Sequence, residues 1–186
     1  MKLIIGLGNP GEKYLQTRHN VAWIIFDKLL PNADWEKSKH AQTLYYKDTI
    51  LENDVEYLKP TTFMNDSGIP AAYAINKHDI SPEDIIVIHD DIDLPIGQIK
   101  ISFDRGDGGH NGVKSIFEHI KTKKIVRIRV GVSIVDDTGI LRKPDVLGNF
   151  SKEELDILKD NISPLVSDIL TTIVSTGYEK AMTKYN

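Results

Sequence analysis

Short apolar runs alternate with stretches of helical spacing along this chain, and the two patterns predict different elements. Short apolar or alternating runs indicate strands, whereas apolar residues that recur every third or fourth position indicate helices. Strands are predicted at residues 2–7, 43–50, 55–58, 85–89, 98–103 and 126–132, and helices at residues 21–30, 66–76 and 111–121. The first helix ends at Pro31, which is typical of a helix boundary.

Local signals define two further regions. The run Glu52-Asn53-Asp54 separates the second and third strands and predicts a hairpin turn. Ser151 and Glu154 have the spacing of a capping box, which opens a first C-terminal helix. Ser163-Pro164 opens a second helix, with proline at a permitted position. The apolar pairs that follow predict one stripe of core residues: Leu165/Val166, Ile169/Leu170, Ile173/Val174 and Ala181/Met182.

The alternation of strands with helices predicts an α/β fold. We expect a single domain over residues 1–186, built on a twisted, mostly parallel or mixed sheet that is flanked by helices and followed by the C-terminal helices. A chain of 186 residues has room for one domain with a real core, and no linker or repeat divides it. Residues 136–148 contain Gly139 and Pro144 and are the best candidate for a mobile loop near a site.

Composition narrows the function classes. Hydrophobic residues make up 40% of the chain and charged residues 27%, as in an ordinary globular protein. The chain has no cysteine, which excludes disulfides, thiolate zinc sites and cysteine nucleophiles. The N-terminal apolar run reaches Gly6 too soon for a signal peptide, and no later run is long enough to span a membrane. We therefore expect a cytoplasmic protein with no membrane partner.

The net charge of −4 argues mildly against non-specific binding to nucleic acid, but the charge is unevenly distributed. One stretch is basic, with Glu118 as its only acid, and contains Lys114, Lys121, Lys123, Lys124, Arg127 and Arg129. The predicted strand at 126–132 places Arg127 and Arg129 on one face. Such a patch can bind phosphate; a solvated helix face with its loop is an equally good interpretation.

His19 is the most informative candidate for chemistry. It belongs to no evident set of metal ligands, and the chain has no serine or cysteine nucleophile motif for it to serve. Asp90 follows the apolar run at 85–89, and Asn9, Asn65 and Asn111 lie in predicted loops. A lone base, a carboxylate to orient it and several neutral amides favour a hydrolase in which histidine activates water directly.

The segment GLGNPG at residues 6–11 has the spacing of a dinucleotide-binding motif. That motif also needs a helix that begins within it and a second strand that ends in an acid. Here Pro10 lacks an N–H, and Asp27 falls inside the predicted helix at 21–30. We favour a sharp turn that exposes the side chain of Asn9, with glycines that serve only backbone geometry as the alternative.

The run HDDID at residues 89–93 allows three interpretations. One aspartate accepts the N–H of His19 and fixes its tautomer, which is the interpretation we favour. Alternatively, the aspartates are solvated turn residues before Pro95, or Asp90, Asp91 and Asp93 hold Mg²⁺ or Mn²⁺ for phosphoester hydrolysis.

Two further segments have both a functional and a structural interpretation. The glycine-rich loop at 106–112 opens a helix and offers N–H groups to an anion or oxyanion, whereas Asn111 alternatively serves as the helix N-cap. Met64, taken alone, is more typical of a core residue. Asn9, Asn65 and Asp90 each follow a predicted strand, so they are expected to gather at the carboxyl edge of the sheet, where ligands bind in open α/β folds.

Four blocks in register resemble the bacterial-type peptidyl-tRNA hydrolase family. They are residues 6–20 (GLGNPG through Tyr14 to TRHN), 59–68 (KPTTFMNDSG), 89–95 (HDDIDLP) and 108–112 (GGHNG). The likeness continues through 127–131 (RIRVG) to 146–150 (VLGNF), so it spans nearly the whole chain. Any one block is weak evidence, but four with matching order and spacing are highly specific.

The resemblance implies cleavage of the ester that joins a peptide's C-terminus to the 3′ ribose of tRNA, so that peptidyl-tRNA is recycled. It implies that His19 is the general base acting on water, that Asp90 orients it, and that Asn111 holds the water or the oxyanion. The positions implied to contact the peptide and the terminal adenosine are Asn9, Asn65, Tyr14, Met64 and His110. No metal, cofactor or covalent nucleophile is implied, and a monomer is expected.

Some positions depart from the family's pattern. Ala22 stands where the family usually has glycine, and Asp107 where neutral residues are common. Ser102 falls near a position that is usually basic and holds tRNA phosphate. The residues expected to contact tRNA phosphate here are Lys100, Arg105 and Arg129, of which Arg129 matches an arginine of the family. Two other hypotheses stay open: an RNA-binding relative without activity, and the metal-dependent phosphohydrolase.

Overall fold

One eight-stranded sheet runs through the protein, in the order β2-β3-β4-β1-β5-β7-β6 with β8 paired to β7. The computed structural model describes residues 1–186. The strands are β1 (Lys2–Gly6), β2 (Glu36–Lys37), β3 (Thr43–Ile50), β4 (Asn53–Pro60), β5 (Ile85–Pro95), β6 (Ile99–Phe103), β7 (Val126–Val135) and β8 (Leu141–Arg142). The central strands β4, β1, β5 and β7 are parallel, whereas β2–β3, β3–β4, β6–β7 and β7–β8 pair antiparallel. The predicted α/β fold with a mixed sheet is confirmed.

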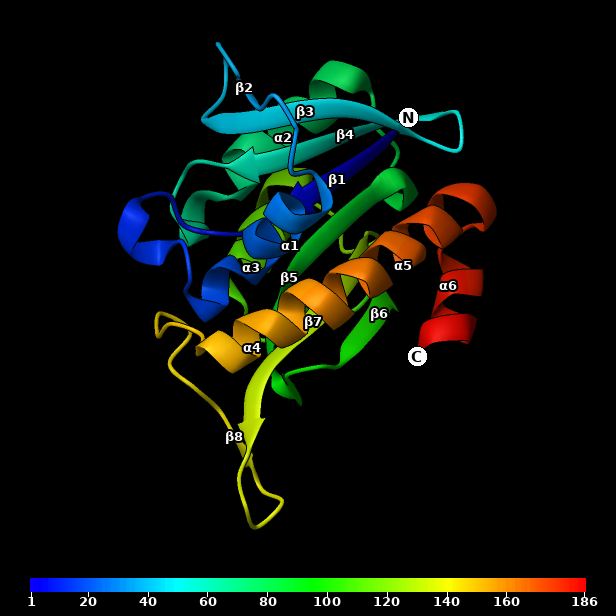
Figure 1. Ribbon diagram of the computed structural model, residues 1–186. Helices are drawn as coiled ribbons and strands as arrows, with labels where there is room; N and C mark the ends of the chain where they lie inside the picture. The colour runs from blue at the N-terminus through cyan, green and yellow to red at the C-terminus, as the bar shows by residue number, and fades with distance from the viewer.

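Helices cover both faces of this sheet (Figure 1). They are α1 (Val21–Leu29), α2 (Gly68–His78), α3 (Asn111–Ile120), α4 (Lys152–Ile157), α5 (Ser163–Thr176) and α6 (Tyr178–Tyr185). Short 3-10 turns lie at Glu12–Tyr14, Arg18–Asn20, Met64–Asp66 and Pro82–Asp84, and a π-helical segment lies at Leu158–Ile162. No helix is both long enough and apolar enough to cross a membrane.

Strand periodicity divides the core into two layers, because successive side chains point to opposite faces. Ile4, Ile86 and Ile88 pack with residues of α1 and α5 in the larger layer. Leu3 and Val87 pack with residues of α2 and α3 in the smaller one. The predicted stripe in the C-terminal helices is confirmed as core, with Val166, Ile169, Leu170, Ile173 and Ala181 buried in the larger layer.

Three local predictions need correction. The hairpin turns at Leu51 and Glu52, which have positive φ, and Asn53 already pairs within β4. The capping box of Ser151 and Glu154 is present. However, α4 continues through the π-helical segment into α5, so residue 163 does not follow a break in the helix.

The third correction concerns β5, which extends to Pro95 rather than ending at 89. β1 ends at Gly6 opposite Ile88, whereas β5 continues beside β7. Asp90 therefore lies on a strand but beyond its neighbour β1, and the interpretation of this acidic run as a turn is wrong. This overhang leaves space next to Asp90 for side chains from other segments.

Candidate active site

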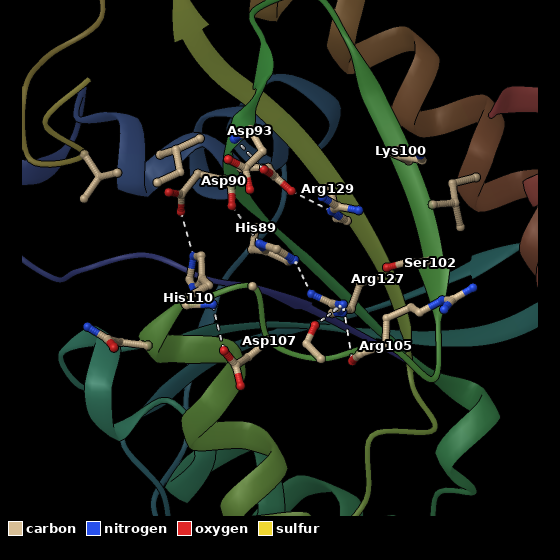
Figure 2. Close-up of a pocket in the computed structure, with 18 of the residues that line it drawn as sticks. His89, Asp90, Asp93, Lys100, Ser102, Arg105, Asp107, His110, Arg127 and Arg129 are labelled. Carbon is tan, nitrogen blue, oxygen red and sulfur yellow. Dashed lines mark hydrogen bonds and ion pairs between the residues drawn. The ribbon is translucent and has the colours of Figure 1, made fainter. Parts of the chain in front are cut away.

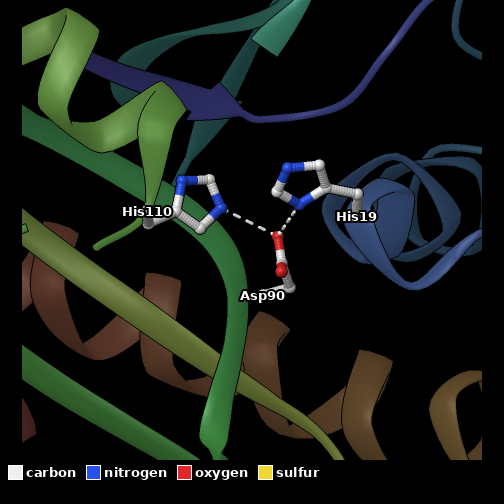
Figure 3. A group of neighbouring side chains, drawn as sticks. All are labelled: His19, Asp90 and His110. Atoms are coloured by element: carbon white, nitrogen blue, oxygen red, sulfur yellow. Dashed lines mark hydrogen bonds and ion pairs between the residues drawn. The ribbon is translucent and has the colours of Figure 1, made fainter. Parts of the chain in front are cut away.

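Two histidines meet one carboxylate oxygen at the carboxyl end of the central strands (Figure 3). Asp90 Oδ1 lies 2.7 Å from Nδ1 of His19 and 2.8 Å from Nε2 of His110. His19 lies in the 3-10 turn before α1, and His110 is the N-cap residue of α3. The predicted pairing of His19 with Asp90 is present, and His110 is a second donor.

Hydrogen bonding defines which nitrogens carry protons. The backbone N–H of Val113 donates to Nδ1 of His110 at 3.3 Å, so Nε2 is the nitrogen that donates to Asp90. His19 directs Nδ1 to Asp90, which leaves Nε2 as its proton acceptor. Figure 3 shows this second nitrogen pointing away from the carboxylate.

The Asp90 carboxylate is held in its charged form. Burial raises the pKa of Asp90, but attraction to His110 and the hydrogen bonds from His110 and His19 more than offset burial. The net result is a pKa well below the usual carboxyl range. A permanent anion here holds the His19 ring in one orientation and stabilises an imidazolium if His19 takes up a proton.

Buried polar neighbours on either side anchor His19. Nη2 of Arg18 donates to both carboxylate oxygens of Glu154, at 2.9 and 3.0 Å, and Nη1 donates to the carbonyl oxygen of Val132 at 3.0 Å. Asn20 is fully buried; it accepts from the backbone N of Asn9 and donates to the carbonyl of Asn9, both at 2.9 Å. Sequence reasoning missed both anchors, since their partners are far away along the chain.

The predicted loop at 136–148 lies beside the site. The backbone N–H of His19 donates to the carbonyl of Val146 at 2.9 Å, and that of Arg18 donates to Gly148 at 3.0 Å. The backbone of the His19 turn is thus bonded to the end of this loop. Mobility of residues 136–148 stays a prediction.

His19, Asp90 and His110 are called the Asp90 group below. A cavity of about 550 Å³ opens next to this group (Figure 2). It is lined by residues of β5, β6 and β7 and of the loop before α3. Of the residues predicted to form a site, it is lined by His19, Asp90, His110, Asn111, Lys100, Arg105 and Arg129. Those predicted for catalysis and for phosphate binding therefore share one cavity.

The other predicted substrate residues lie outside this cavity, on adjoining loops. Asn9 Oδ1 accepts from the backbone N of Met64 at 2.9 Å, and the ring of Tyr14 meets Phe63 edge to face at 6.4 Å. Asn65 is exposed, whereas Met64 is buried in the smaller core layer. The prediction that the turn exposes the Asn9 side chain is wrong, because Asn20 and Met64 hold Asn9 at 6% exposure.

Asn111 is not the N-cap of α3, so the structural alternative for this residue is wrong. His110 is the N-cap of α3, and Asn111 is the first helical residue, exposed at the cavity. Gly112 lets this helix end approach the core closely, since an added Cβ would lie 2.4 Å from Met64 Sδ. The Asn111 side chain is therefore free for a ligand rather than used as a cap.

The aspartates of the run at 89–93 have separate partners and do not share one binding point. Asp91 accepts from Nε of Arg129 at 2.5 Å, and Asp93 pairs with Lys143 at 2.6 Å. Ligand atoms of His19, Asp90 and His110 lie within 4.8 Å of one another. However, each imidazole nitrogen nearest Asp90 faces the carboxylate oxygen at hydrogen-bond distance, so its proton occupies the direction that a metal would need.

The basic stretch divides into two groups. The lysines at 114, 121, 123 and 124 are exposed and do not line the cavity. Arg127 and Arg129 share one face of β7, as predicted, and both line the cavity. Lys100 pairs across strands with Arg129, and Ser102 with Arg127. The Ser102 hydroxyl is buried and has no hydrogen-bond partner.

The half-buried His19 and the buried Asp90 form a histidine–carboxylate pair at the end of a mixed α/β sheet, and the cavity beside them is lined by both cations and carboxylates. The sequence pattern of the peptidyl-tRNA hydrolase family matches residues 3–186. The chain therefore belongs to the peptidyl-tRNA hydrolase family, and its activity is the hydrolysis of peptidyl-tRNA.

Individual relatives agree with this assignment over their full length. The peptidyl-tRNA hydrolase of Thermotoga petrophila is 41% identical over 184 residues, which cover 99% of this chain and 96% of that protein. That of Clostridium botulinum strain Alaska E43 is 42% identical over 188 residues, covering 100% and 96%. The crystal structure of peptidyl-tRNA hydrolase from Acinetobacter baumannii superimposes with a TM-score of 0.87 at 29% identity, covering 100% of this chain and 94% of that one.

Proposed function

We propose that this protein cleaves the ester of peptidyl-tRNA with His19 as general base and Asp90 as the group that orients it. The observation that carries the proposal is the 2.7 Å hydrogen bond between Asp90 Oδ1 and His19 Nδ1 at the cavity. It leaves Nε2 of His19 as the acceptor of a proton from water.

In the proposed reaction, one proton passes from water to His19 and then to the leaving oxygen of the ribose. His19 Nε2 takes a proton from a water molecule while the water oxygen attacks the ester carbonyl carbon. The tetrahedral intermediate then collapses, the bond to the ribose 3′ oxygen breaks, and the imidazolium of His19 returns the proton to that oxygen. Asp90 stays ionised throughout and stabilises the imidazolium. The products are a tRNA with a 3′ hydroxyl and a peptide with a carboxylic acid, which carries the second proton of the water and loses it to solvent at neutral pH.

Neutral amides supply the remaining polar contacts in this proposal. Asn111, exposed at the end of α3, donates to the attacking water or to the oxyanion of the intermediate. The peptide and the terminal adenosine contact a second group of residues: Asn9, Tyr14, Met64, Asn65 and His110. A supporting contact is that Asn9 is bonded to both Asn20 and Met64, so it lies between the His19 turn and the segment that carries Asn65.

The cations of the cavity position the nucleic acid. Lys100 and Arg105 are exposed, and Arg129 uses only Nε within the protein. We propose that these three contact tRNA phosphates, which orient the acceptor end without reading its sequence. The reaction as proposed needs neither a metal nor another cofactor, and the proposed setting is a monomer in the cytoplasm.

The decisive experiment compares N-acetyl-aminoacyl-tRNA with free aminoacyl-tRNA as substrates, with EDTA present. We expect rapid ester release from the blocked substrate and little from the free one. Loss of activity in EDTA would support a metal-dependent mechanism instead. Tight tRNA binding with no turnover in either condition would identify an RNA-binding relative without activity.

A further inference from the structure

Both terminal nitrogens of Arg127 have partners inside the protein, although the residue lines the cavity. Arg127 is 3% exposed. Its Nη2 donates to the carbonyl of Gly106 at 2.7 Å and to that of Arg105 at 3.4 Å, and its Nη1 lies 3.4 Å from Nε2 of His89. Figure 2 shows these contacts between β7 and the loop before α3. Both terminal nitrogens are therefore already bonded within the protein.

Its neighbour on the same face of β7 differs in this respect. Arg129 donates through Nε to Asp91, and its two terminal nitrogens make no hydrogen bond within the protein. Position along the strand makes the two arginines look equivalent, but their bonding assigns them different roles. Arg129 can accommodate a ligand, whereas Arg127 connects two parts of the protein.

His89 extends the contact of Arg127 toward Asp90. Burial lowers the pKa of His89 well below its usual value, and the charges of His110 and Arg127 act in the same direction. The neutral ring donates from Nδ1 to the carbonyl of Asp90 at 2.7 Å, so Nε2 accepts from Arg127. The same ring meets His110 edge to face, with centroids 4.7 Å apart.

We propose that Arg127 is a positioning residue for the reaction: it holds the start of the glycine-rich loop at 106–112 against β5, so that His110 and Asn111 keep their places beside Asp90. Between Gly106 and His110, which bonds Asp90, the loop makes local hydrogen bonds to Asp107. Cβ atoms added at Gly106, Gly108 and Gly109 would meet nothing within 4 Å, so the space beside these three glycines is open. This inference rests on the proposed role of the Asp90 group in catalysis.

Geometry rather than charge makes arginine suitable for this position. A planar guanidinium donates to a ring nitrogen and to two carbonyls at once, whereas a lysine ammonium is a compact point charge on a flexible stem. Substitution by lysine keeps the positive charge of the cavity but is expected to lose the simultaneous contacts. Charge and geometry are therefore separable by experiment.

The test measures kcat and KM for N-acetyl-aminoacyl-tRNA at several salt concentrations for Arg127→Gln, Arg127→Lys and Arg129→Gln. We expect both Arg127 variants to lose about 10- to 100-fold in kcat, because small misplacements of catalytic groups have effects of this size. Their KM and its salt dependence should stay near the wild-type values. Arg129→Gln should instead raise KM and reduce the salt dependence, as the loss of a phosphate contact requires.

A raised KM with unchanged kcat in Arg127→Gln, or full rescue by Arg127→Lys, would overturn the inference. His89→Asn, which breaks the link to Arg127 from the other side, keeps the test decisive if Arg127→Gln does not fold. Nitrogen-15 NMR of the His110 ring distinguishes failure of the proposed catalytic mechanism from failure of the positioning role of Arg127. If His19→Ala remains active, the proposed mechanism fails, whereas an unchanged His110 signal in folded Arg127→Lys contradicts the positioning role itself.

Discussion

Asp90 accepts a hydrogen bond from His19 at 2.7 Å across 71 positions of sequence, through the same oxygen that His110 contacts at 2.8 Å. The overhang of β5 beyond β1 makes room for this meeting. Two donors on one buried carboxylate oxygen keep the pKa of Asp90 low, since each bond favours the ionised form. The orientation of His19 thus depends on an anion that does not titrate at neutral pH.

Replacing His19 with alanine should remove the general base. We expect kcat for N-acetyl-aminoacyl-tRNA to fall by about 10²- to 10⁴-fold, the usual contribution of such a base. Binding of tRNA, measured by filter retention or fluorescence, should be retained, because the cavity cations are unchanged. His40→Ala is the matched control at an exposed histidine and should keep full activity. Wild-type turnover by His19→Ala would rule out the assignment of the base.

Replacing Asp90 with asparagine should disturb the His19 tautomer. The amide nitrogen of asparagine can donate to Nδ1, which would place the ring proton on Nε2 and block proton uptake from water. A loss in kcat of about 10²-fold or more is expected. Asp156→Asn, at an exposed position on α4, is the control. Equal kcat for Asp90→Asn and wild type would show that orientation by an anion is unnecessary.

Neutralising the cavity cations should weaken tRNA binding without affecting chemistry. Lys100→Gln and Arg105→Gln are each expected to lower the slope of log affinity against log salt by about 0.7 per lost phosphate contact. Lys47→Gln provides the control, because Lys47 is exposed on β3, at the opposite side of the sheet from β6. A slope that is the same in all three variants would exclude Lys100 and Arg105 from the phosphate contacts.

Removing the Asn20 side chain should destabilise the whole protein. Its loss leaves the backbone N–H and carbonyl of Asn9 without their partners in a fully buried place. Each such group costs about 1–3 kcal/mol, so urea denaturation of Asn20→Ala should show a large drop in the free energy of unfolding. The control Asn161→Ala, at an exposed position, should remain within about 0.5 kcal/mol of wild type.

Stability should fall in mild acid because of His89. Burial holds the folded-state pKa of His89 well below the unfolded value of 6.5, and the charges of His110 and Arg127 add to the effect, opposed by Asp90. Between the two pKa values the unfolded chain binds more protons, so the free energy of unfolding decreases as pH drops below about 6.5. The contribution approaches about 1.4 kcal/mol per pH unit.

Urea titrations of wild type and His89→Asn at pH 7.5 and pH 5.5 measure this effect. The variant lacks the buried titrating ring, so its free energy of unfolding should decline less over this interval. Parallel declines in the two proteins would mean that His89 is not the group responsible.

The pattern of the chain by itself determined the α/β fold, the central strands, the helices and the candidate residues His19, Asp90 and Asn111. Periodicity suffices for these because burial of one face of each element depends on local spacing. The predicted start of β5 agrees with the structure, but its end does not, because pairing with β7 continues through residues whose side chains are polar.

Only the tertiary structure decided how the polar residues are partnered. Asn9 is buried rather than exposed because Asn20 bonds its backbone, and Asp91 pairs with Arg129. Arg127 and Arg129 have the same residue type, the same face and the same strand, yet one is committed to His89 and the loop while the other keeps free donors. Such differences depend on contacts between segments far apart in sequence, because hydrogen-bond partners are set by position in space and leave no periodic signal along the chain.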